Sequence, residues 1–312
     1  MQKRFKDFPR LRFNFGIQTF DDEILNESWR GYRFEELQGF LRQLIEYKKS
    51  TTLLNADFIA FGKWTKMGEK KILRNQEKIN FFRNMVQSHI FDSFSLYTLE
   101  LFPWSKRYYE CSKEKNTHEK NGLSLKKYGS DDEVYEEFSF LKKIIFSAGY
   151  RRYELSNFSL LGKSSIHNRV YWTMEEYLGL GISGSSFLKE EIPIVKNDGL
   201  EKEMINWNGY WFRFTHKDSI VEYMENPTWS FKESRFLNEK NYLIEKFFLG
   251  LRTSEGIRDI TFFNKILIPN RQEKIQDFVQ NWFMSQKDER IVLTDKGMDV
   301  YNTIVSELLN EI

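Results

Sequence analysis

The chain has 312 residues, and its 47 lysine and arginine residues nearly balance 45 aspartate and glutamate residues, so a net charge of +2 gives no field that would recruit nucleic acid or anionic lipid. No apolar run approaches the ~20 residues that a membrane-spanning helix needs, and the N-terminal MQKRFKDFPR lacks the apolar region of a secretory signal. The single cysteine, Cys111, excludes a disulfide framework within the chain, and together these features predict a cytoplasmic protein with no integral membrane segment.

The N-terminal third is predicted to alternate between strands and helices. Residues 12–20 (RFNFGIQTF) are typical of a buried strand that enters a turn. The elements that follow are a helix at 23–47, a strand at 56–61 (ADFIAF), a helix at 72–88 and a strand at 93–101 (SFSLYTLEL). This alternation indicates parallel βαβ units, whose ligands bind at the carboxyl ends of the strands. We therefore expect an α/β protein in which the three strands lie parallel and adjacent in chain order.

A polar segment separates these units from the next predicted helix. Residues 111–132 are charged and lack periodicity, which predicts a solvated loop. His118 follows Cys111 by seven residues, and we attribute this spacing to chance rather than to a metal site. Residues 133–148 have the pattern of an amphipathic helix, and Gly149 is expected just after its last turn.

The stretch 153–187 (YELSNFSLLGKSSIHNRVYWTMEEYLGLGISGSSF) carries the most specific pattern in the chain. Its aromatic ends predict strands, and residues 152–158 are expected to continue the sheet of the first three strands. Between these ends lie His167, Asn168, Tyr171 and Trp172 in the order His-Asn-x-x-Tyr-Trp, followed by a Gly-x-Gly turn at 179–181.

The last third is predicted to be mainly helical. A tryptophan-rich connection begins near residue 198, and the expected elements after it are helices at 236–252, 259–266 and 272–284, a strand at 290–294 and a helix at 296–309. Helix, helix, strand and helix in this order, with LTDKG before the last helix, predict a small winged-helix-like module.

From about Leu11 to the C-terminus the sequence resembles the radical S-adenosylmethionine (radical SAM) family, on the side of the enzymes related to oxygen-independent coproporphyrinogen oxidase. The His-Asn-x-x-Tyr-Trp pattern is similar to that of the haem-chaperone (HemW) branch, and FFLGLRTSEGI at residues 247–257 resembles its LRxxEGI-type helix end. The resemblance implies the C-terminal half of a radical-SAM-type partial (β/α) barrel, from strand four onward, at residues 1–190. It implies a small, helical, winged-helix-like C-terminal domain at residues 191–312.

Three positions resemble the S-adenosylmethionine contacts of the family. Gln18 stands where the family has an IGVQSF strand end, Arg30 (in WRGY) where it has an LGR-type turn, and Asp57 where it has a DLIYGLP-type strand. An amide at a strand end and an arginine fork can bind a carboxylate, and an aspartate accepts hydrogen bonds from ribose hydroxyls. The structural alternative is that Gln18 caps a turn, Arg30 lies on the surface and Asp57 only begins a strand.

The sequence also departs from the family pattern. Lys63 and Trp64 replace the LP after the aspartate strand, residues 102–105 (FPWS) replace an EPGT-type turn, and residues 184–186 (GSS) replace a GAHS-type end. The CxxxCxxC motif is absent, and one cysteine cannot supply the three thiolates of a [4Fe–4S] cluster that binds S-adenosylmethionine. We assign no catalytic residue and no metal ligand. Two explanations stay open: a truncated product whose upstream fragment completes the barrel, or a cluster-free descendant.

His167 is the candidate haem ligand, because a neutral imidazole is a natural axial ligand to haem iron. Tyr171 and Trp172 would offer flat aromatic contacts to a porphyrin. The alternative is that His167 hydrogen-bonds backbone in a tight turn while Tyr171 and Trp172 belong to the core.

Three functions follow from these features. The first is a haem chaperone of the radical SAM type that binds haem or porphyrin and passes haem to a respiratory acceptor. The second is an oxygen-independent coproporphyrinogen III dehydrogenase, and the third is a non-catalytic remnant. The first strand, at 12–20, is expected to present an apolar edge that promotes self-association.

Overall fold

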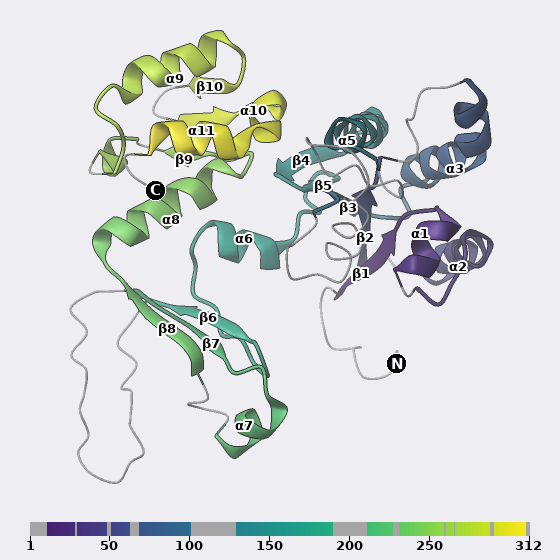
Figure 1. Cartoon of the computed structure of the whole chain (residues 1–312), viewed down its shortest axis with the longest axis horizontal. Coiled ribbons are helices and arrows are strands. Elements are labelled where there is room, and N and C mark those ends of the chain that lie inside the picture. The colour runs from purple at the N-terminus through teal and green to yellow at the C-terminus, as the bar shows by residue number, and fades with distance from the viewer. Residues whose placement is uncertain are drawn as a thin grey trace, which may run out of the picture. The chain divides into compact units, whose positions relative to one another are not determined.

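The computed structural model describes residues 11–28, 30–48, 51–62, 69–100, 129–189, 211–226, 231–258, 260–264, 266–287 and 290–309 (Figure 1). By compactness the chain divides into two units, Met1–Ser164 and Ser165–Ile312. The domain boundary between residues 190 and 191 remains a prediction, because a division by compactness need not coincide with a division by ancestry. Most of the expected loop at 111–132, together with positions 63–64 and 102–105, lies outside the described residues.

The first unit alternates strands and helices, as expected from the sequence. Its elements are β1 (Leu11–Gln18), α1 (Asp22–Glu27), α2 (Phe34–Tyr47), β2 (Thr52–Ala60), α3 (Glu69–Gln87), β3 (Ser93–Thr98), α5 (Asp131–Ser147), β4 (Arg151–Glu154) and β5 (Asn157–Ser159). The prediction of one helix over 23–47 was wrong. The side chain of Asp22 accepts a hydrogen bond from the backbone of Phe34, and that of Glu36 accepts one from Arg33, so a second helix begins there.

The first unit is built on a five-stranded sheet in the order β1-β2-β3-β5-β4. β1 pairs parallel with β2 and β2 parallel with β3, which confirms the expected order. β5 runs antiparallel to β3, and β4 pairs with β5 as the second arm of a hairpin. The stretch around 152–158 therefore continues the sheet as expected. β5, the later of its two strands, lies between β3 and β4.

The two faces of this sheet differ in chemistry because side chains alternate along each strand. One face is apolar: Phe58, Phe94 and Phe158 join a core with buried side chains of α2, α3 and α5. The other face carries Asn55 and Ser95, which are buried although polar. Figure 1 shows the three helices arranged along the sheet. The hydrogen-bonded side chains of β2 and β3 thus lie on the face opposite the helices.

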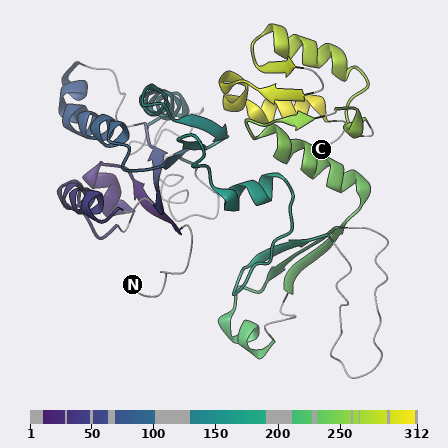
Figure 2. The ribbon, with the colours of Figure 1, turned by 180° about the vertical axis from the view of Figure 1, so that it is seen from behind.

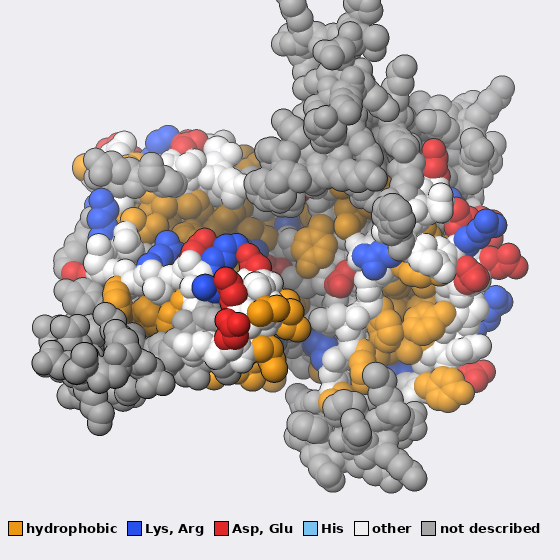
Figure 3. Space-filling model, turned by 60° about the horizontal axis from the view of Figure 1, so that its bottom comes forward, with side chains coloured by type: hydrophobic (Ala, Val, Ile, Leu, Met, Phe, Trp, Pro, Cys, Tyr) orange, Lys and Arg blue, Asp and Glu red, His pale blue; other side chains and the backbone are white. Residues whose placement is uncertain are grey.

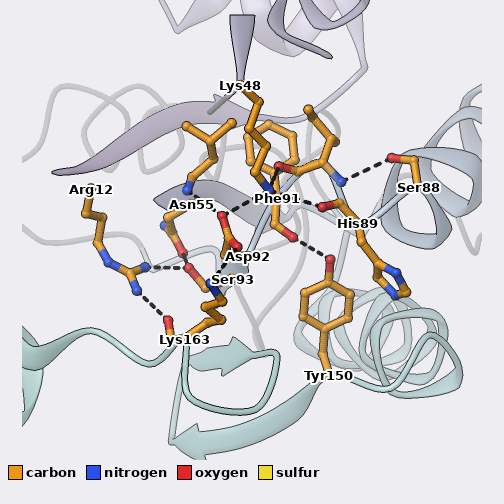
Figure 4. Close-up of polar contacts among 12 residues, drawn as sticks. Arg12, Lys48, Asn55, Ser88, His89, Phe91, Asp92, Ser93, Tyr150 and Lys163 are labelled. Carbon is orange, nitrogen blue, oxygen red and sulfur yellow. Dashed lines mark hydrogen bonds and ion pairs between the residues drawn. The ribbon is translucent and has the colours of Figure 1, made fainter. Parts of the chain in front are cut away.

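A buried carboxylate, that of Asp92, lies just before β3 and links neighbouring segments of the sheet (Figure 4). Its Oδ2 accepts a hydrogen bond from Leu54 N at 2.9 Å and lies 3.1 Å from Lys48 Nζ. Lys163 Nζ lies 3.9 Å from Oδ1. Beside it, the hydroxyl of Tyr150 donates to the carbonyl of Phe91 at 2.5 Å, and burial raises the pKa of Tyr150. These contacts join β2, β3 and the segments after α2 and β5.

β1 forms one edge of the described sheet, and Phe13 on it is 40% exposed. An apolar side chain on an open edge promotes pairing with another chain. We expect Phe13→Lys to shift the protein from higher oligomers toward monomer in sedimentation velocity, because a charged side chain opposes edge pairing. Phe40→Lys is the matched control, since Phe40 is also 40% exposed but lies on α2. Equal behaviour of wild type and both variants as monomers would contradict the expectation.

The second unit combines two small antiparallel sheets with helices. Its elements are α6 (Ile166–Trp172), β6 (Ser185–Leu188), β7 (Trp211–His216), α7 (Ile220–Glu225), β8 (Phe231–Leu237), α8 (Glu239–Leu251), β9 (Ile257–Arg258), a 3₁₀ turn (Ile260–Phe263), α9 (Arg271–Gln280), β10 (Met284–Lys287), β11 (Arg290–Leu293), α10 (Asp295–Asp299) and α11 (Tyr301–Leu308). The sheets have the orders β6-β7-β8 and β10-β11-β9. Figure 2 shows α8 continuing from the end of β8. Among the described helices, none has the length and apolar character required to cross a membrane.

Several predictions for this unit were wrong. The segment expected as a connection contains β7 and β8, and the helix expected from 236 begins at Glu239, because Phe236 pairs with Phe212 in the sheet. The helix expected at 259–266 is, where described, a 3₁₀ turn. The helix expected at 272–284 ends at Gln280, and the closing helix is interrupted at Val300. The strand expected at 290–294 is confirmed as β11.

One end of the second unit has an apolar surface. The short helix α7 directs Tyr223 inward, where its hydroxyl accepts a hydrogen bond from Gly181 N at 3.0 Å. Its apolar side chains and those of the adjoining loop are exposed: Leu178, Leu180, Ile182, Ile220, Val221 and Met224. In Figure 3, where this end comes forward, hydrophobic side chains lie beside acidic ones. These residues are therefore not part of the core that α8 covers.

Candidate functional site

Gln18, the first expected contact residue, ends β1 in an unusual backbone conformation. Its φ is 68°, in the left-handed region that non-glycine residues rarely adopt and that costs on the order of 1 kcal/mol. The pairing register of β1 with β2 shifts between Gly16 and Gln18, so a bulge lies at this strand end. Bulges re-aim side chains beside functional sites. The local fold therefore directs the Gln18 amide away from the regular alternation of the strand.

Arg30 and Gln18 both approach Gly16. A Cβ atom at position 16 would lie 2.7 Å from Gln18 Nε2 and 3.8 Å from Arg30 Nη1. The hydroxyl of Tyr32 donates to the carbonyls of Gly16 at 2.9 Å and Ile17 at 3.2 Å, which ties the segment after α1 to the strand end. Burial raises the pKa of Tyr32, so this donor stays protonated at neutral pH. Within the described residues, the side chains of Gln18 and Arg30 have no hydrogen-bond partner.

Asp57 lies opposite Gly16 in the register of β1 and β2. Asn55 Nδ2 donates to Asp57 Oδ1 at 2.7 Å and to Ser95 Oγ at 3.0 Å. Burial raises the pKa of Asp57, and hydrogen bonds from Ser95 and Asn55 offset part of that rise. The carboxylate is only partly buried, so one side of it remains open to a ligand.

The structure thus places the side chains of Gln18 and Arg30 beside Gly16, near the carboxyl end of β1, with Asp57 opposite this glycine on β2. An amide, a guanidinium and a carboxylate in this arrangement can bind a ligand that carries both a carboxylate and vicinal hydroxyls. Tyr32, Asn55 and Ser95 were not expected from the sequence. The period-two alternation of Asn55 with Asp57 was a usable signal for the second of these. For Tyr32 the only signal was its position two residues after Arg30.

In the second unit, the His-Asn-x-x-Tyr-Trp pattern forms helix α6, which is capped by Ser165. His167 is exposed, and its Nε2 lies 3.0 Å from the hydroxyl of Tyr171 one turn later. The two rings meet edge to face with centroids 4.9 Å apart. His167 thus lies on a helix rather than in a tight turn, and the partner of its Nε2 in the described part of the chain is a side chain. Tyr171 is only partly buried.

Trp172 anchors α6 to α8 through a cation–π contact. The guanidinium carbon of Arg252, at the C-terminal end of α8, lies 3.7 Å from the centroid of the Trp172 ring. Arg169, also on α6, forms an ion pair with Glu255. Trp172 Nε1 is buried, and no hydrogen-bond partner for it lies within the described residues. Trp172 is thus a partly buried anchor, and Tyr171 and His167 lie on the open part of α6.

Arg252 and Glu255 belong to the segment LRTSEGI, which the sequence analysis linked to the family only as a helix end. The structure adds that this segment contacts the His-Asn-x-x-Tyr-Trp helix through both residues. No local pattern predicts this pairing, because Arg169 and Glu255 lie 86 positions apart.

The residues of this sequence do not fit an iron–sulfur cluster. The sequence has one cysteine, which lies outside the described residues. Within the described part of the chain, no three His, Cys, Asp or Glu side chains gather as metal ligands would. No chemical step is therefore assigned through such a cluster.

No protein-family model matches the chain. Two relatives named heme chaperone HemW resemble it. That of Lactococcus lactis is 27% identical over 184 residues, which cover 58% of this chain and 43% of the relative. That of Bacillus subtilis is 24% identical over 310 residues, which cover 96% of this chain and 70% of the relative. This chain thus spans less than half of the first relative and about 70% of the second.

A solved structure has the same fold. It is the coproporphyrinogen III oxidase HemN from Escherichia coli, described as a radical SAM enzyme. The TM-score is 0.61 at 12% sequence identity, and the match covers 97% of this chain and 64% of the other. The likeness establishes the fold of the α/β chain and extends over both of its units.

Proposed function

We propose that this chain, which is a HemW-like protein of the radical SAM family, binds haem and delivers it to a respiratory acceptor protein. The observation that carries the proposal is the arrangement of α6, where Trp172 is held against Arg252 while His167 stays exposed. An exposed imidazole on an anchored helix can reach haem iron without rearrangement of a core. The likeness to two haem chaperones supports the same assignment.

We also propose that the first unit binds S-adenosylmethionine. Arg30 would hold the carboxylate of the amino acid, Gln18 would donate to it or to the ribose, and Asp57 would accept bonds from the ribose hydroxyls. In the family this molecule supplies radical chemistry at an iron–sulfur cluster. The residues of this sequence do not fit that cluster, so the proposal is limited to binding.

The finer fold assignment belongs to the same proposal. The sheet of the first unit would form part of a radical-SAM-type barrel, with the open edge of β1 able to pair with a strand from an upstream fragment. The elements from α8 to α11 would form a winged-helix-like domain. A second candidate function is coproporphyrinogen III dehydrogenase, which the likeness of fold to the Escherichia coli enzyme favours. Haem binding without decarboxylation of coproporphyrinogen would separate the two.

A haem titration followed at the Soret band tests the first function. We expect His167→Ala to weaken haem binding about 10-fold, because it removes an axial ligand. Tyr171→Phe is expected to strengthen binding about 5-fold. In the wild type the Tyr171 hydroxyl is hydrogen-bonded to His167 Nε2, and this bond, worth about 1 kcal/mol, must break before Nε2 can bind iron. The phenylalanine variant lacks the bond and therefore does not carry this cost.

Two controls separate this site from adventitious haem binding. His89→Ala removes an imidazole of the first unit that bonds the carbonyl of Ala148 at 2.9 Å. Cys111→Ala removes the one thiol. Neither change should alter the affinity or the spectrum. If His167→Ala retained the wild-type Soret band and affinity, the motif would be structural and the haem assignment wrong.

A further inference from the structure

We infer that Asn55 and Ser95 are positioning residues that hold the carboxylate of Asp57 oriented and ionised for the ribose of the ligand. The inference rests on the proposed binding of S-adenosylmethionine and adds residues that act through Asp57 rather than on the ligand. It concerns a hydrogen-bonded network on the polar face of the sheet.

The network begins with one amide that bridges two strands. Asn55 Nδ2 lies 2.7 Å from Asp57 Oδ1 and 3.0 Å from Ser95 Oγ. Asn55 and Ser95 are each 4% exposed, so these bonds form out of contact with bulk water. A buried amide held by two partners has little freedom. It therefore fixes one oxygen of Asp57 and leaves the other for a ligand.

Neighbouring residues determine which way the Asn55 amide points. Ser93 Oγ lies 2.6 Å from Asn55 Oδ1, and Arg12 Nη1 lies 2.6 Å from Ser93 Oγ. Arg12 can only donate, so the Ser93 hydroxyl accepts from it and donates its own proton to Asn55 Oδ1. The nitrogen of the amide must then face Asp57 and Ser95. The orientation of Asn55 is thus set by an arginine at the start of β1.

Ser95 links the Asn55 amide to the hairpin of β4 and β5. Its Oγ accepts a hydrogen bond from Asn55 Nδ2 at 3.0 Å and donates one to Asn157 Oδ1 at 2.8 Å. The amide of Asn157 donates to the buried carboxylate of Glu154. Removal of the Ser95 hydroxyl therefore takes one of its partners from the Asn55 amide and leaves the bond from Asn55 to Asp57 less firmly held.

The charges around Asp57 agree with this role. Burial raises its pKa, and the bonds from Ser95 and Asn55 offset part of that rise. Arg30 lies near Gly16, which is opposite Asp57 in the register of the sheet. Arg12 acts through Ser93 and Asn55, and Glu154 acts through Asn157 and Ser95. The ionised form accepts ribose hydroxyls, so binding is present above the pKa of Asp57 and is lost as the pH falls through it. Removal of a donor moves that loss to higher pH.

Titration calorimetry of the full chain with S-adenosylmethionine, repeated across pH, tests the inference. Ser95→Ala is expected to weaken binding about 5-fold near neutral pH, the effect of losing one neutral hydrogen bond that holds the Asn55 amide against Asp57, and to move the midpoint of the pH profile upward. Ser159→Ala is the matched control. Ser159 is 5% exposed, lies on β5 opposite Ser93, and is not part of the network. We expect it to leave both the affinity and the midpoint unchanged.

An equal loss of affinity at every pH, with an unmoved midpoint, would mean that Ser95 only supports the fold and would overturn the inference. If wild-type protein bound no S-adenosylmethionine, the proposed function of the first unit would fail separately. In that case the pKa of Asp57 can be measured in the ligand-free protein by following its carboxyl carbon resonance in NMR spectra across pH. An upward shift of the Asp57 pKa in Ser95→Ala, absent in Ser159→Ala, supports the positioning role, and an unchanged pKa refutes it.

Discussion

Replacement of Asp92 by alanine is expected to lower the free energy of unfolding of the first unit by about 2–4 kcal/mol. The carboxylate is buried, accepts a bond from Leu54 N and neutralises Lys48 at 3.1 Å. Its loss leaves a buried backbone donor without an acceptor and a partly buried ammonium without its counter-charge. Lys48 retains a bond to the carbonyl of Ile90 at 2.7 Å, which keeps the effect below that of a fully buried pair.

Two further variants divide this effect into its causes. Asp92→Asn retains an oxygen for Leu54 N but loses the charge, so we expect about half the destabilisation of alanine. Asp218→Ala is the control for an exposed pair, since Asp218 lies 2.6 Å from Lys232 on the surface. We expect no measurable change from it, because solvent screens such pairs.

The measurement must resolve the two units, because their unfolding need not be a single two-state transition. Native-state hydrogen exchange of amides in β2 and β3 reports the first unit directly. Faster exchange of these amides in Asp92→Ala, with unchanged exchange in α8, is the expected pattern. Unchanged exchange rates of the Leu54 amide and its neighbours in Asp92→Ala would show that the carboxylate does not stabilise the sheet.

The sheet of the first unit could be predicted because its strands carry their own pattern. Phe94 and Leu96 alternate with Ser93 and Ser95, and the helices between strands have a clear period. The break after α1 could not be read in the same way. It depends on the Asp22 carboxylate reaching Phe34 N, a contact between residues 12 positions apart that no local periodicity records.

The strands β6, β7 and β8 could not be predicted from the sequence for a different reason. Trp211 to His216 alternates buried and partly buried side chains, a strand pattern that the density of tryptophan concealed. Phe236 fits a helix by spacing, yet it lies on β8 and pairs with Phe212 of β7. Tertiary pairing overrode helix propensity there.

For the candidate sites, resemblance to the family suggested individual residues but not their arrangement in space. Gln18, Arg30 and Asp57 could be named from motif positions, and the structure places them beside or opposite Gly16. Their common centre could not be named, because the approach of Gln18 to Gly16 depends on the bulge between β1 and β2. The same holds for Trp172 and Arg252, which only the packing of α6 on α8 brings into contact.

Asp57→Asn is expected to weaken binding of S-adenosylmethionine about 30-fold, measured by calorimetry on the full chain. Hydrogen bonds from ribose hydroxyls to a carboxylate are stronger than those to a neutral amide, and the loss corresponds to about 2 kcal/mol. The binding of wild type should increase as the pH rises through the Asp57 pKa, which burial raises above its ordinary value of about 3.9. Asp57→Asn should lose this dependence, and an unaltered pH profile would contradict the assignment.

Gly16→Ala provides the stricter test, because it changes the site without touching a polar group. Alanine is allowed at position 16, whose φ is not in the left-handed region, but its Cβ would lie 2.7 Å from Gln18 Nε2. The flexible amide can move aside, so we expect the fold to be retained and binding of S-adenosylmethionine to fall about 10-fold. If the methyl group acts only by displacing Gln18, then Gly16→Ala combined with Gln18→Ala should bind no worse than Gln18→Ala alone. Strict additivity of the two losses would mean that Gly16 and Gln18 act independently, and Gly16 would not be the centre of the site.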